Sequence, residues 1–482
     1  MTAGTRPPGG TRPNLIVIVL DSFRQDHVGV YHGGRAPFPG IDPCRTPHLD
    51  RFAAQSLIFE RAYPEAFPTI PVRTALMTGQ RTLPFRPWQP LQPTDVTVAE
   101  VLRRHGYVNG LVSDTYHYRA PGMNFHRGFH AYRWVRGQEY DPYESGAPRR
   151  RLDEYVNDNY PPLWRGRIAQ FLANTDAFVR PGDWFAPRVV AEATDWLERN
   201  RDHPNVFLWL DSFDPHEPWD PPRAFDHYTD PAYRGRRLIM PMGGRASDWA
   251  DEREVQHIRG LYAGEAESVD AALGPLFETL ERLGYYEDSL ILVVADHGHP
   301  LADHGKFLKG ADRLYNELLQ VPFLLRLPGG RRGGTRVGAM VQYHDVLPTL
   351  FDLMGLSGET EDMHGRSFRA LVDGSADAAP AGAHRPVCIT GYHAGVDRVV
   401  RAAGVDGDGR NWSLILRPEG EPDELYDLDA DPSERTNLID ARHQVAARLA
   451  GRFGPTYFRR QERLQTVKGV QGAYEVASGS VE

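Results

Sequence analysis

The chain has 482 residues, of which 41% are hydrophobic, and its 47 glycines and 39 prolines indicate a globular protein with many loops. Its formal net charge of −9 argues against general nucleic-acid binding, which needs a basic surface. The negative charge does not exclude a small anionic substrate, because a metal ion or an arginine can dominate the field inside a cleft.

Cysteine usage and the lack of long apolar runs bear on the cellular compartment of the protein. Cys44 and Cys388 are the only cysteines, so no disulfide framework is expected and a reducing compartment is compatible. Residues 1–11 lack the apolar segment of a signal peptide, and no run of about 18 apolar residues occurs. We therefore expect a cytoplasmic protein that contacts neither membrane nor nucleic acid.

The first predicted element is a strand at residues 15–20, an unbroken apolar and β-branched run typical of a parallel sheet buried on both faces. Asp21 follows it directly. In open α/β sheets the carboxyl ends of the strands form the usual ligand crevice, so Asp21 is a candidate ligand. The alternative is that its carboxylate caps a turn.

A helix is predicted to begin at Pro68 and Thr69 and to end at Gly79, a typical C-terminal capping residue. A hydroxyl at such a helix start lies at the positive end of the helix dipole, where anions are stabilised. Arg73 lies one turn further on and can bind a tetrahedral oxyanion. The alternative is an ordinary N-cap threonine.

The middle of the chain alternates between regular elements and a long irregular region. Residues 97–105 predict a helix and 110–114 a short strand, which is followed closely by His117. Residues 119–180 are rich in Arg, Tyr and Pro with weak periodicity, so we expect an insertion over the site that determines substrate specificity. Residues 189–199 predict another helix.

A second buried strand is predicted at residues 206–210. The proline-rich loop after it contains Asp214 and His216, and His216 is either functional or merely hydrogen-bonded. Residues 253–283 predict a long helix.

A third buried strand at residues 289–295 is followed by Asp296 and His297, a ligand pair suited to Zn²⁺ or Mn²⁺. Structural polar residues are the alternative, but three apolar strands followed by acid or histidine are improbable by chance. From about residue 376 an Ala/Gly/Pro-rich linker, shorter strands and a charged helix at 440–453 indicate a small C-terminal α+β domain, 376–482, after a catalytic domain, 1–375.

These motifs together resemble the sulfatase branch of the alkaline phosphatase superfamily over most of the chain. Residues 69–73, Thr-Ile-Pro-Val-Arg, stand where that family has its Cys/Ser-x-Pro-x-Arg nucleophile signature. Further family motifs in the family's order occur at residues 12–14, 46–50, 214–218, 296–298, 303–305, 309–310, 348–350, 365–367, 425–428 and 431–432. The resemblance implies an α/β fold with a large mixed, mostly parallel sheet between helices, as in alkaline phosphatase.

The resemblance also implies the metal centre. Asp21, Asp296 and His297 become ligands of a divalent cation, most readily Zn²⁺ or Mn²⁺ with Ca²⁺ or Mg²⁺ as alternatives, and Thr69 becomes the nucleophile touching the same metal. A second metal would need further ligands, for which the candidates are Asp214, His216, His304 and His344. Two-metal relatives present an Asp-x-x-x-His pair, whereas Asp214 and His216 are two residues apart, so we expect one metal per chain.

The remaining roles follow in the same way. Arg73 and His117 would hold the non-bridging oxygens of the substrate or orient the nucleophile. His216 and Lys309 would stand on the leaving-group side as cations or general acid. Asp214 and His304 could support these groups from behind.

Three departures from the sulfatase pattern bear on the reaction. Sulfatases convert Cys or Ser to formylglycine. Thr69 cannot undergo this conversion because its β-carbon carries a methyl group. Ser22 replaces an acidic residue after Asp21, and His297 stands where many sulfatases have Asn. These features resemble the phosphohydrolases of the superfamily, which include nucleotide pyrophosphatase/phosphodiesterases, phosphonoacetate hydrolase and lipoteichoic-acid synthase-like transferases.

The sequence thus predicts a metal-dependent hydrolase of a phosphate ester, phosphodiester or phosphonate that forms a phospho-threonine. One alternative is a transferase, in which an acceptor alcohol replaces water. Others are a sulfate-ester hydrolase that works without formylglycine and a catalytically silent binding protein. The expected partner is a small anionic ester, and a homo-oligomer is left open.

Overall fold

The computed structural model describes most of the chain. The described residues are 12–83, 86–118, 122–375, 382–393, 400–406, 409–417 and 421–451. Among them, no helix has both the length and the apolar character needed to cross a bilayer.

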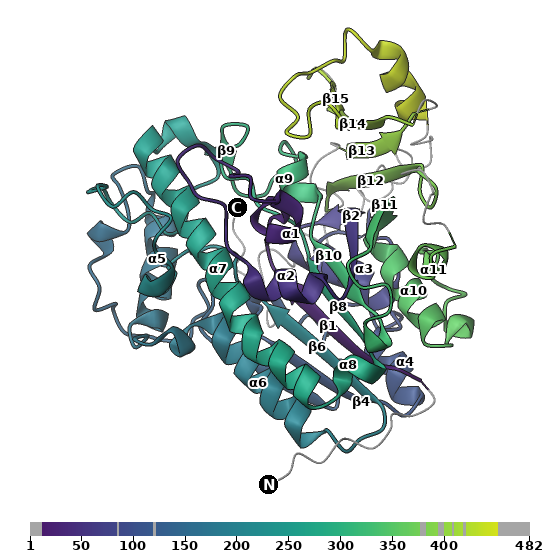
Figure 1. Cartoon of the computed structure of the whole chain (residues 1–482). Coiled ribbons are helices and arrows are strands. Elements are labelled where there is room, and N and C mark those ends of the chain that lie inside the picture. Colours follow the sequence, from purple (N-terminus) through teal and green to yellow (C-terminus); the bar gives the residue numbers. More distant parts are fainter. Residues whose placement is uncertain are drawn as a thin grey trace.

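An eight-stranded sheet in the order β11-β2-β10-β8-β1-β6-β4-β5 forms the centre of the larger part of the molecule (Figure 1). Its strands are β1 (Asn14–Leu20), β2 (Leu57–Tyr63), β4 (Val108–Ser113), β5 (Ala131–Trp134), β6 (Val206–Ser212), β8 (Ser289–Ala295), β10 (Phe323–Arg326) and β11 (Arg336–Gln342). All neighbours pair in parallel except β10, which is antiparallel to β2 and to β8. The predicted mixed, mostly parallel sheet is confirmed.

The three strands predicted from apolar runs lie side by side at the centre of this sheet. β1 pairs with β6 on one side and β8 on the other, and every residue of the three strands is buried. Unbroken Val, Ile and Leu runs suit this position because both faces of a central parallel strand are covered by helices. In this register Leu20 lies opposite Ser212 and Ala295, so the three strands end at one edge.

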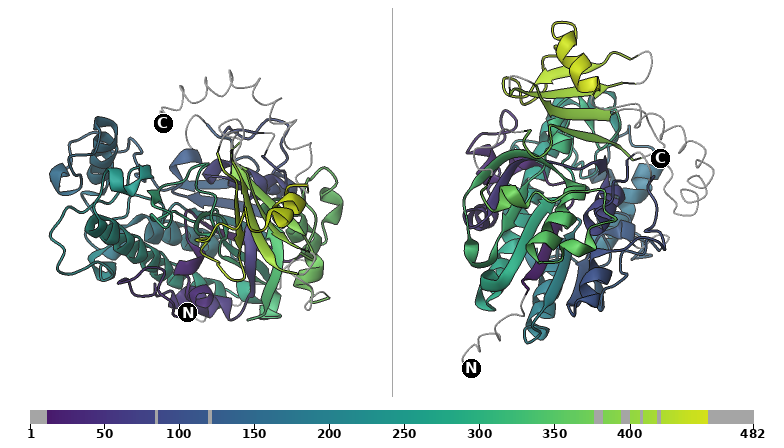
Figure 2. Two further views of the ribbon diagram at one scale, coloured as in Figure 1. Left: turned by 90° about the horizontal axis from the view of Figure 1, so that it is seen from above. Right: turned by 90° about the vertical axis from the view of Figure 1, so that its right-hand side faces the viewer.

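Helices flank the sheet in two packed groups (Figures 1 and 2). One group contains α2 (Pro47–Ala53), α6 (Phe185–Arg199), α7 (Glu252–Arg282) and α8 (Tyr285–Asp288), and the other α3 (Thr69–Thr78), α4 (Val98–Arg104), α10 (Val346–Leu353) and α11 (Arg369–Val372). The remaining α-helices are α1 (Gly29–His32), α5 (Pro162–Thr175) and α9 (Asn316–Leu319). The long α7 begins with a capping box between Asp251 and Glu254, which fixes its first turn.

Helix α3 begins at Thr69 and ends at Thr78, and Gly79, predicted as its C-terminal capping residue, is the C-cap in the left-handed conformation at φ 67°. All ten of its residues are buried. The two-residue strand β3 (Ala66–Phe67) comes directly before it and belongs to a second sheet.

This second sheet has the order β15-β14-β13-β12-β3 and lies above the main sheet in Figure 1. Its C-terminal strands are β12 (Val387–Tyr392), β13 (Val400–Val405), β14 (Asn411–Leu416) and β15 (Glu424–Asp427), and residues 443–451 are helical. β12 pairs in parallel with β3, so the C-terminal sheet attaches to the segment just before Thr69. Residues 452–453 of the predicted helix lie outside the described residues.

The predicted insertion, 119–180, differs from expectation at its start. β5 pairs in parallel with β4 and is the edge strand of the main sheet, so 131–134 are part of the core fold. Its side chains are half-buried or exposed, and an edge strand of this kind has no continuous apolar run to reveal it. Helix α5 supplies regular structure in the rest of the region, while residues 119–121 lie outside the described residues.

Candidate active site

A cluster of acidic groups and one histidine lies where β1, β6 and β8 end. Asp21, Asp296 and His297 are fully buried, and each offers a ligand atom within 4.8 Å of the others. Ser22, in the left-handed region at φ 61°, orients both carboxylates: its backbone N–H donates to Asp296 Oδ1 (2.9 Å) and its hydroxyl to Asp21 Oδ1 (2.8 Å). The residue that replaces the second acid of sulfatases therefore supports the cluster from behind.

Unsatisfied atoms in this cluster fit a divalent cation. His297 Nδ1 lies 2.7 Å from the carbonyl oxygen of Gly298, which assigns the proton to Nδ1 and leaves the lone pair on Nε2. Nε2 is buried and has no hydrogen-bond partner among the described residues. Asp21 Oδ2 is buried too and forms no hydrogen bond there, although it is ion-paired with Arg73 Nη1 at 3.0 Å. An imidazole nitrogen and carboxylate oxygens are the ligand types that Zn²⁺ and Mn²⁺ take.

The two carboxyls of the cluster differ in how readily they ionise. Burial and the charge of Asp296 raise the pKa of Asp21 well above its usual value. Burial acts in the same direction on Asp296, but His297 and Arg73 outweigh it and lower its pKa to about 2. Added positive charge at the cluster would favour the ionisation of Asp21.

Arg73 lies in the middle of three carboxylates. Its Nε and Nη2 donate to Asp211 at 3.2 and 2.7 Å, and its Nη1 lies 3.0 Å from Asp21 Oδ2 and also donates to Asp296. Nη1 is 3.5 Å from the carbonyl oxygen of Thr69, one turn back on α3. Of the two predicted roles, these contacts favour orienting the nucleophile, because the guanidinium is occupied by protein oxygens.

Asp211, which sequence reasoning did not single out, anchors this arginine. It is fully buried and also accepts hydrogen bonds from Thr115 Oγ1 (2.9 Å), Trp209 Nε1 (3.1 Å) and the Tyr118 hydroxyl. The signal was present in the sequence, since Asp211 directly follows the apolar run at residues 206–210, just as Asp21 and Asp296 follow theirs.

A second cluster contains His216, Glu217 and Lys309. Lys309 Nζ lies 2.8 Å from His216 Nε2 and 2.8 Å from Glu217 Oε2. Burial and the charge of Lys309 lower the pKa of His216 well below its usual value, so the histidine is neutral and accepts from the ammonium group. The roles predicted for His216 and Lys309, as cations or general acid, stay predictions.

His117 connects the two clusters. It lies in a short 3₁₀ turn after β4, and its ring packs against Phe213 and Trp88 at centroid distances of 5.5 and 5.1 Å. Burial, Lys309 and Arg73 lower the pKa of His117 to about 3, so it too is neutral. Its Nε2 lies 3.5 Å from Oε2 of Glu139, a residue of the predicted insertion.

The other three candidate residues lie outside these clusters. Asp214 accepts from Gln138 Nε2 and from the backbone N–H of Ala186, so it fixes the loop that carries His216. His344 contacts Arg385 at 2.9 Å, beside the C-terminal sheet. Because these residues face different partners, they do not come together as a group of metal ligands among the described residues.

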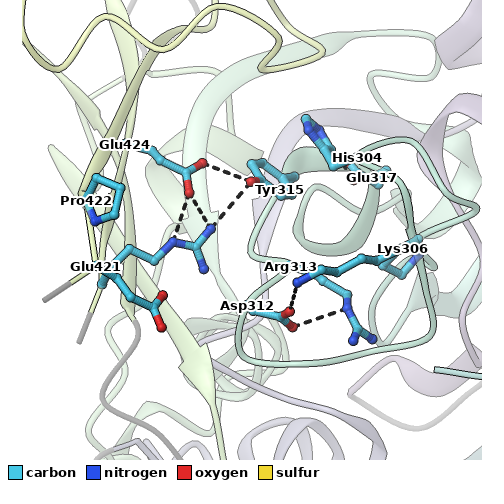
Figure 3. A pocket seen from close by; sticks show the side chains of 11 residues that line it. His304, Lys306, Asp312, Arg313, Tyr315, Glu317, Glu421, Pro422 and Glu424 are labelled. Atoms are coloured by element: carbon cyan, nitrogen blue, oxygen red, sulfur yellow. Dashed lines mark hydrogen bonds and ion pairs between the residues drawn. The ribbon is translucent and has the colours of Figure 1, made fainter. Parts of the chain in front are cut away.

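His304 lines a separate cavity of about 280 Å³ between residues 300–317 and residues 417–424 of the C-terminal region (Figure 3). Its ring stacks on Tyr315 at a centroid distance of 3.6 Å, and its Nε2 lies 3.6 Å from Glu317. Burial and the charge of Arg435 lower the pKa of His304 to about 4.

The fold is of the alkaline phosphatase type, and it holds a buried group of residues that could bind a metal ion where the central strands end. The chain belongs to the sulfatase family, whose model matches residues 13–356. A second model, N-sulphoglucosamine sulphohydrolase, C-terminal, matches residues 302–453.

Relatives of this chain include a multifunctional protein of the alkaline phosphatase superfamily and arylsulfatases. A multifunctional alkaline phosphatase superfamily protein, PehA, of Trinickia caryophylli is 28% identical over 398 residues, which cover 73% of this chain and 75% of that protein. An arylsulfatase of Clostridium perfringens is 24% identical, covering 89% of this chain and 91% of that protein. Both proteins are similar to this chain over most of its length.

Solved structures share the fold. The phosphonate monoester hydrolase of Agrobacterium radiobacter superimposes with a TM-score of 0.68 at 20% identity, over 93% of this chain and 96% of that one. The phosphonate monoester hydrolase of Silicibacter pomeroyi gives the same TM-score at 22% identity, over 94% of this chain and 96% of that one.

Proposed function

We propose that this protein is a metal-dependent hydrolase of a phosphate ester, phosphodiester or phosphonate, with Thr69 as the nucleophile. The proposal rests on two features, a threonine at the start of α3 and the buried group of Asp21, Asp296 and His297. Arg73 links the two, because its Nη1 contacts the Thr69 carbonyl oxygen and both carboxylates.

Asp21, Asp296 and His297 would hold the cation, together with the hydroxyl of Thr69. When bound, a divalent cation lowers the pKa of the Thr69 hydroxyl and neutralises charge on the phosphoryl group. Thr69 then attacks phosphorus in line, the ester oxygen leaves, and water hydrolyses the phospho-threonine. Lys309, fixed by His216 and Glu217, places an ammonium charge beside the reacting group.

Phosphoryl esters are proposed in preference to sulfate esters because of the side chain of Thr69. In a formylglycine enzyme the sulfated intermediate expels sulfate with the help of a second hydroxyl on the same carbon. Thr69 carries a methyl group and a hydrogen there, so a threonine sulfate would have to be attacked by water at sulfur. A phosphoryl transition state also carries more negative charge, which Lys309 and a divalent cation stabilise better.

The test compares kcat/KM for matched aryl phosphodiester, phosphonate and sulfate esters, with Mn²⁺ or Zn²⁺ supplied. We expect the phosphodiester or phosphonate to react fastest, and mass spectrometry of quenched enzyme to locate a phosphoryl group on Thr69. A sulfate ester that wins by tenfold, which is about 1.4 kcal/mol in transition-state stabilisation, would overturn the proposal. Product analysis with added alcohols separates a hydrolase from a transferase.

A further inference from the structure

The amide group of Gln138 joins two buried carboxyl groups beside the loop that carries His216. Gln138 lies in the predicted insertion, between β5 and α5, and its side chain is buried. Its Nε2 donates to Asp114 Oδ2 (3.2 Å) and to Asp214 Oδ1, and its Oε1 accepts from the backbone N–H of Glu139 (3.1 Å). A primary amide has two N–H groups on one nitrogen, and here each of them meets a carboxyl oxygen.

These two acids hold the turn that leads to His216. Asp114 directly follows β4, and its Oδ1 accepts from the backbone N–H of Phe213 (2.6 Å). Asp214 is the next residue of the turn, and its Oδ2 accepts from the backbone N–H of Ala186 in α6 (3.0 Å). The backbone N–H of His216 donates to the carbonyl oxygen of Phe213 (2.8 Å), and the two rings stack at a centroid distance of 4.1 Å. The position of the His216 ring therefore depends on both carboxyl groups.

The end of this turn determines where the ammonium group of Lys309 lies. Lys309 Nζ is 2.8 Å from His216 Nε2 and 2.8 Å from Oε2 of Glu217, the next residue along the chain. Because both contacts come from consecutive residues of one turn, a shift of the turn moves the ammonium group as well. A charge or a proton assists the departure of an oxygen only from within hydrogen-bonding reach. A small displacement of the turn should therefore weaken catalysis.

The insertion holds Gln138 in place from the other side. Asn174 of α5 donates from Nδ2 to the carbonyl oxygens of Gly137 (2.9 Å) and Asp141 (2.8 Å). The Asp141 carboxylate in turn accepts from the backbone N–H of Gly137 (3.0 Å). The short segment that carries Gln138 is therefore fixed to α5, and the glutamine amide connects it to the turn before His216.

A neutral residue with two donors suits this position. Burial raises the pKa of Asp214 to about 6 and, together with the charge of Asp214, raises the pKa of Asp114 well above its usual value. A glutamate in place of Gln138 would add a third acidic group to this buried pair. An apolar side chain would leave two buried carboxyl oxygens without the donor they now have.

We propose that Gln138 is a positioning residue, which aligns the turn from Phe213 to His216 and through it the Lys309 ammonium group with the leaving oxygen of the substrate. This proposal rests on the proposed function. Gln138 acts through His216 and Lys309 and takes no part in bond making. The insertion thus contributes to catalysis, in addition to the substrate specificity expected from the sequence.

A leaving-group series separates this role from a purely structural one. Wild type, Gln138→Met and the control Gln320→Met are compared on phosphodiesters that release p-nitrophenol, phenol or a simple alcohol. Gln320 is a half-buried glutamine whose Nε2 also joins two acceptors, Gln25 Oε1 and the carbonyl oxygen of Glu60, at 2.9 Å each. The control therefore removes the same kind of contact at a different place in the fold.

The measured quantity is kcat/KM, which reports the steps up to the departure of the leaving group. A charge or proton at the departing oxygen matters most when the leaving group is poor. We expect Gln138→Met to lose about 10–100-fold in kcat/KM for the alkyl ester and less than about threefold for the p-nitrophenyl ester, whereas Gln320→Met matches wild type on each ester.

A double-mutant cycle with Lys309→Ala tests the route of the effect. If Gln138 acts through Lys309, the loss that Gln138→Met causes on the phenyl ester should shrink at least about threefold once Lys309 is alanine. Additive losses, an equal loss for all of the esters, or no loss at all would each overturn the proposal. Should Gln138→Met not fold, Gln138→Asn replaces it under the same criteria, because it keeps the amide on a side chain one methylene shorter.

Failure of this inference is distinct from failure of the proposed function. If sulfate esters prove to be the better substrates, the proposed function fails, and the same leaving-group series on aryl and alkyl sulfates still tests Gln138. If phosphoryl esters are preferred but the effect of Gln138→Met does not depend on the leaving group, only the inference about Gln138 fails.

Discussion

Replacing Asp211 with asparagine should weaken both the fold and the metal site. Asp211 accepts two hydrogen bonds from Arg73 and one each from Thr115, Trp209 and Tyr118. Asparagine keeps the shape of the side chain but removes its charge. It also replaces one accepting oxygen with an amide nitrogen, which is a donor and would face the donors that Asp211 now accepts from. Asp211→Asn therefore leaves the guanidinium with one partner fewer and one unfavourable contact more.

The size of the effect follows from the contacts of Arg73. Removing one partner of a buried ion pair typically costs about 3–5 kcal/mol. Asp21 and Asp296 remain beside Nη1, so we expect the lower end of that range, about 3 kcal/mol in the free energy of unfolding. Arg73 would also be drawn more strongly toward the metal ligands, and we expect metal affinity to fall by about 10–100-fold.

Urea unfolding followed by tryptophan fluorescence measures the first effect, and competition with a fluorescent chelator measures the second. The matched control is Asp195→Asn, since Asp195 is 46% exposed and pairs with Arg133 and Arg199 at the surface. Such exposed pairs contribute about 0–1 kcal/mol. If Asp211→Asn matched the control in both assays, the idea that Asp211 anchors Arg73 and limits its attraction to the metal ligands would be refuted.

Three further predictions follow from the site and its surroundings. Thr69→Ala should abolish turnover with metal content retained, because three ligands survive, while Thr69→Ser keeps part of the activity; wild-type turnover by Thr69→Ala would rule out the nucleophile. Chelation should remove activity, one equivalent of Zn²⁺ or Mn²⁺ should restore it, and His297→Ala should lower metal content measured by elemental analysis; two equivalents retained after exhaustive dialysis would contradict a single site. Arg385 and His384 hold the pKa of buried Asp345 well below its usual value. The contribution of ionised Asp345 to the free energy of unfolding is therefore complete above about pH 4 and is lost as the pH falls further. The difference in urea midpoint between wild type and Asp345→Asn should shrink in acid, and a constant difference would disprove the linkage.

Much of the fold could be predicted because the central strands carry a local signal. Unbroken apolar runs identify β1, β6 and β8, and the end of each strand identifies where Asp21 and Asp296 must meet. β2, β5 and β11 were not predicted as strands. β5 is an edge strand, and β2 and β11 include half-buried or exposed polar residues that interrupt an apolar pattern.

Prediction was weaker for residues whose role depends on distant partners. Gln138 comes from an irregular stretch without a motif, and only the folded chain brings its amide group to Asp114 and Asp214. His304 and His344 fit a ligand pattern by residue type, but the fold places one against Tyr315 and the other against Arg385. Residue type therefore suggested candidates, and three-dimensional packing selected among them.

The sequence by itself determined the parallel sheet, the helix that begins at Thr69, and the meeting of Asp21 with Asp296 and His297. These features follow from local rules, because adjacent parallel strands deliver their carboxyl ends to one edge. Only the tertiary structure decided that Arg73 is held by Asp211, 138 positions away, and that His216 is neutral beside Lys309. The charge state and the orientation of these groups depend on burial and on long-range neighbours, which no local pattern in the chain records.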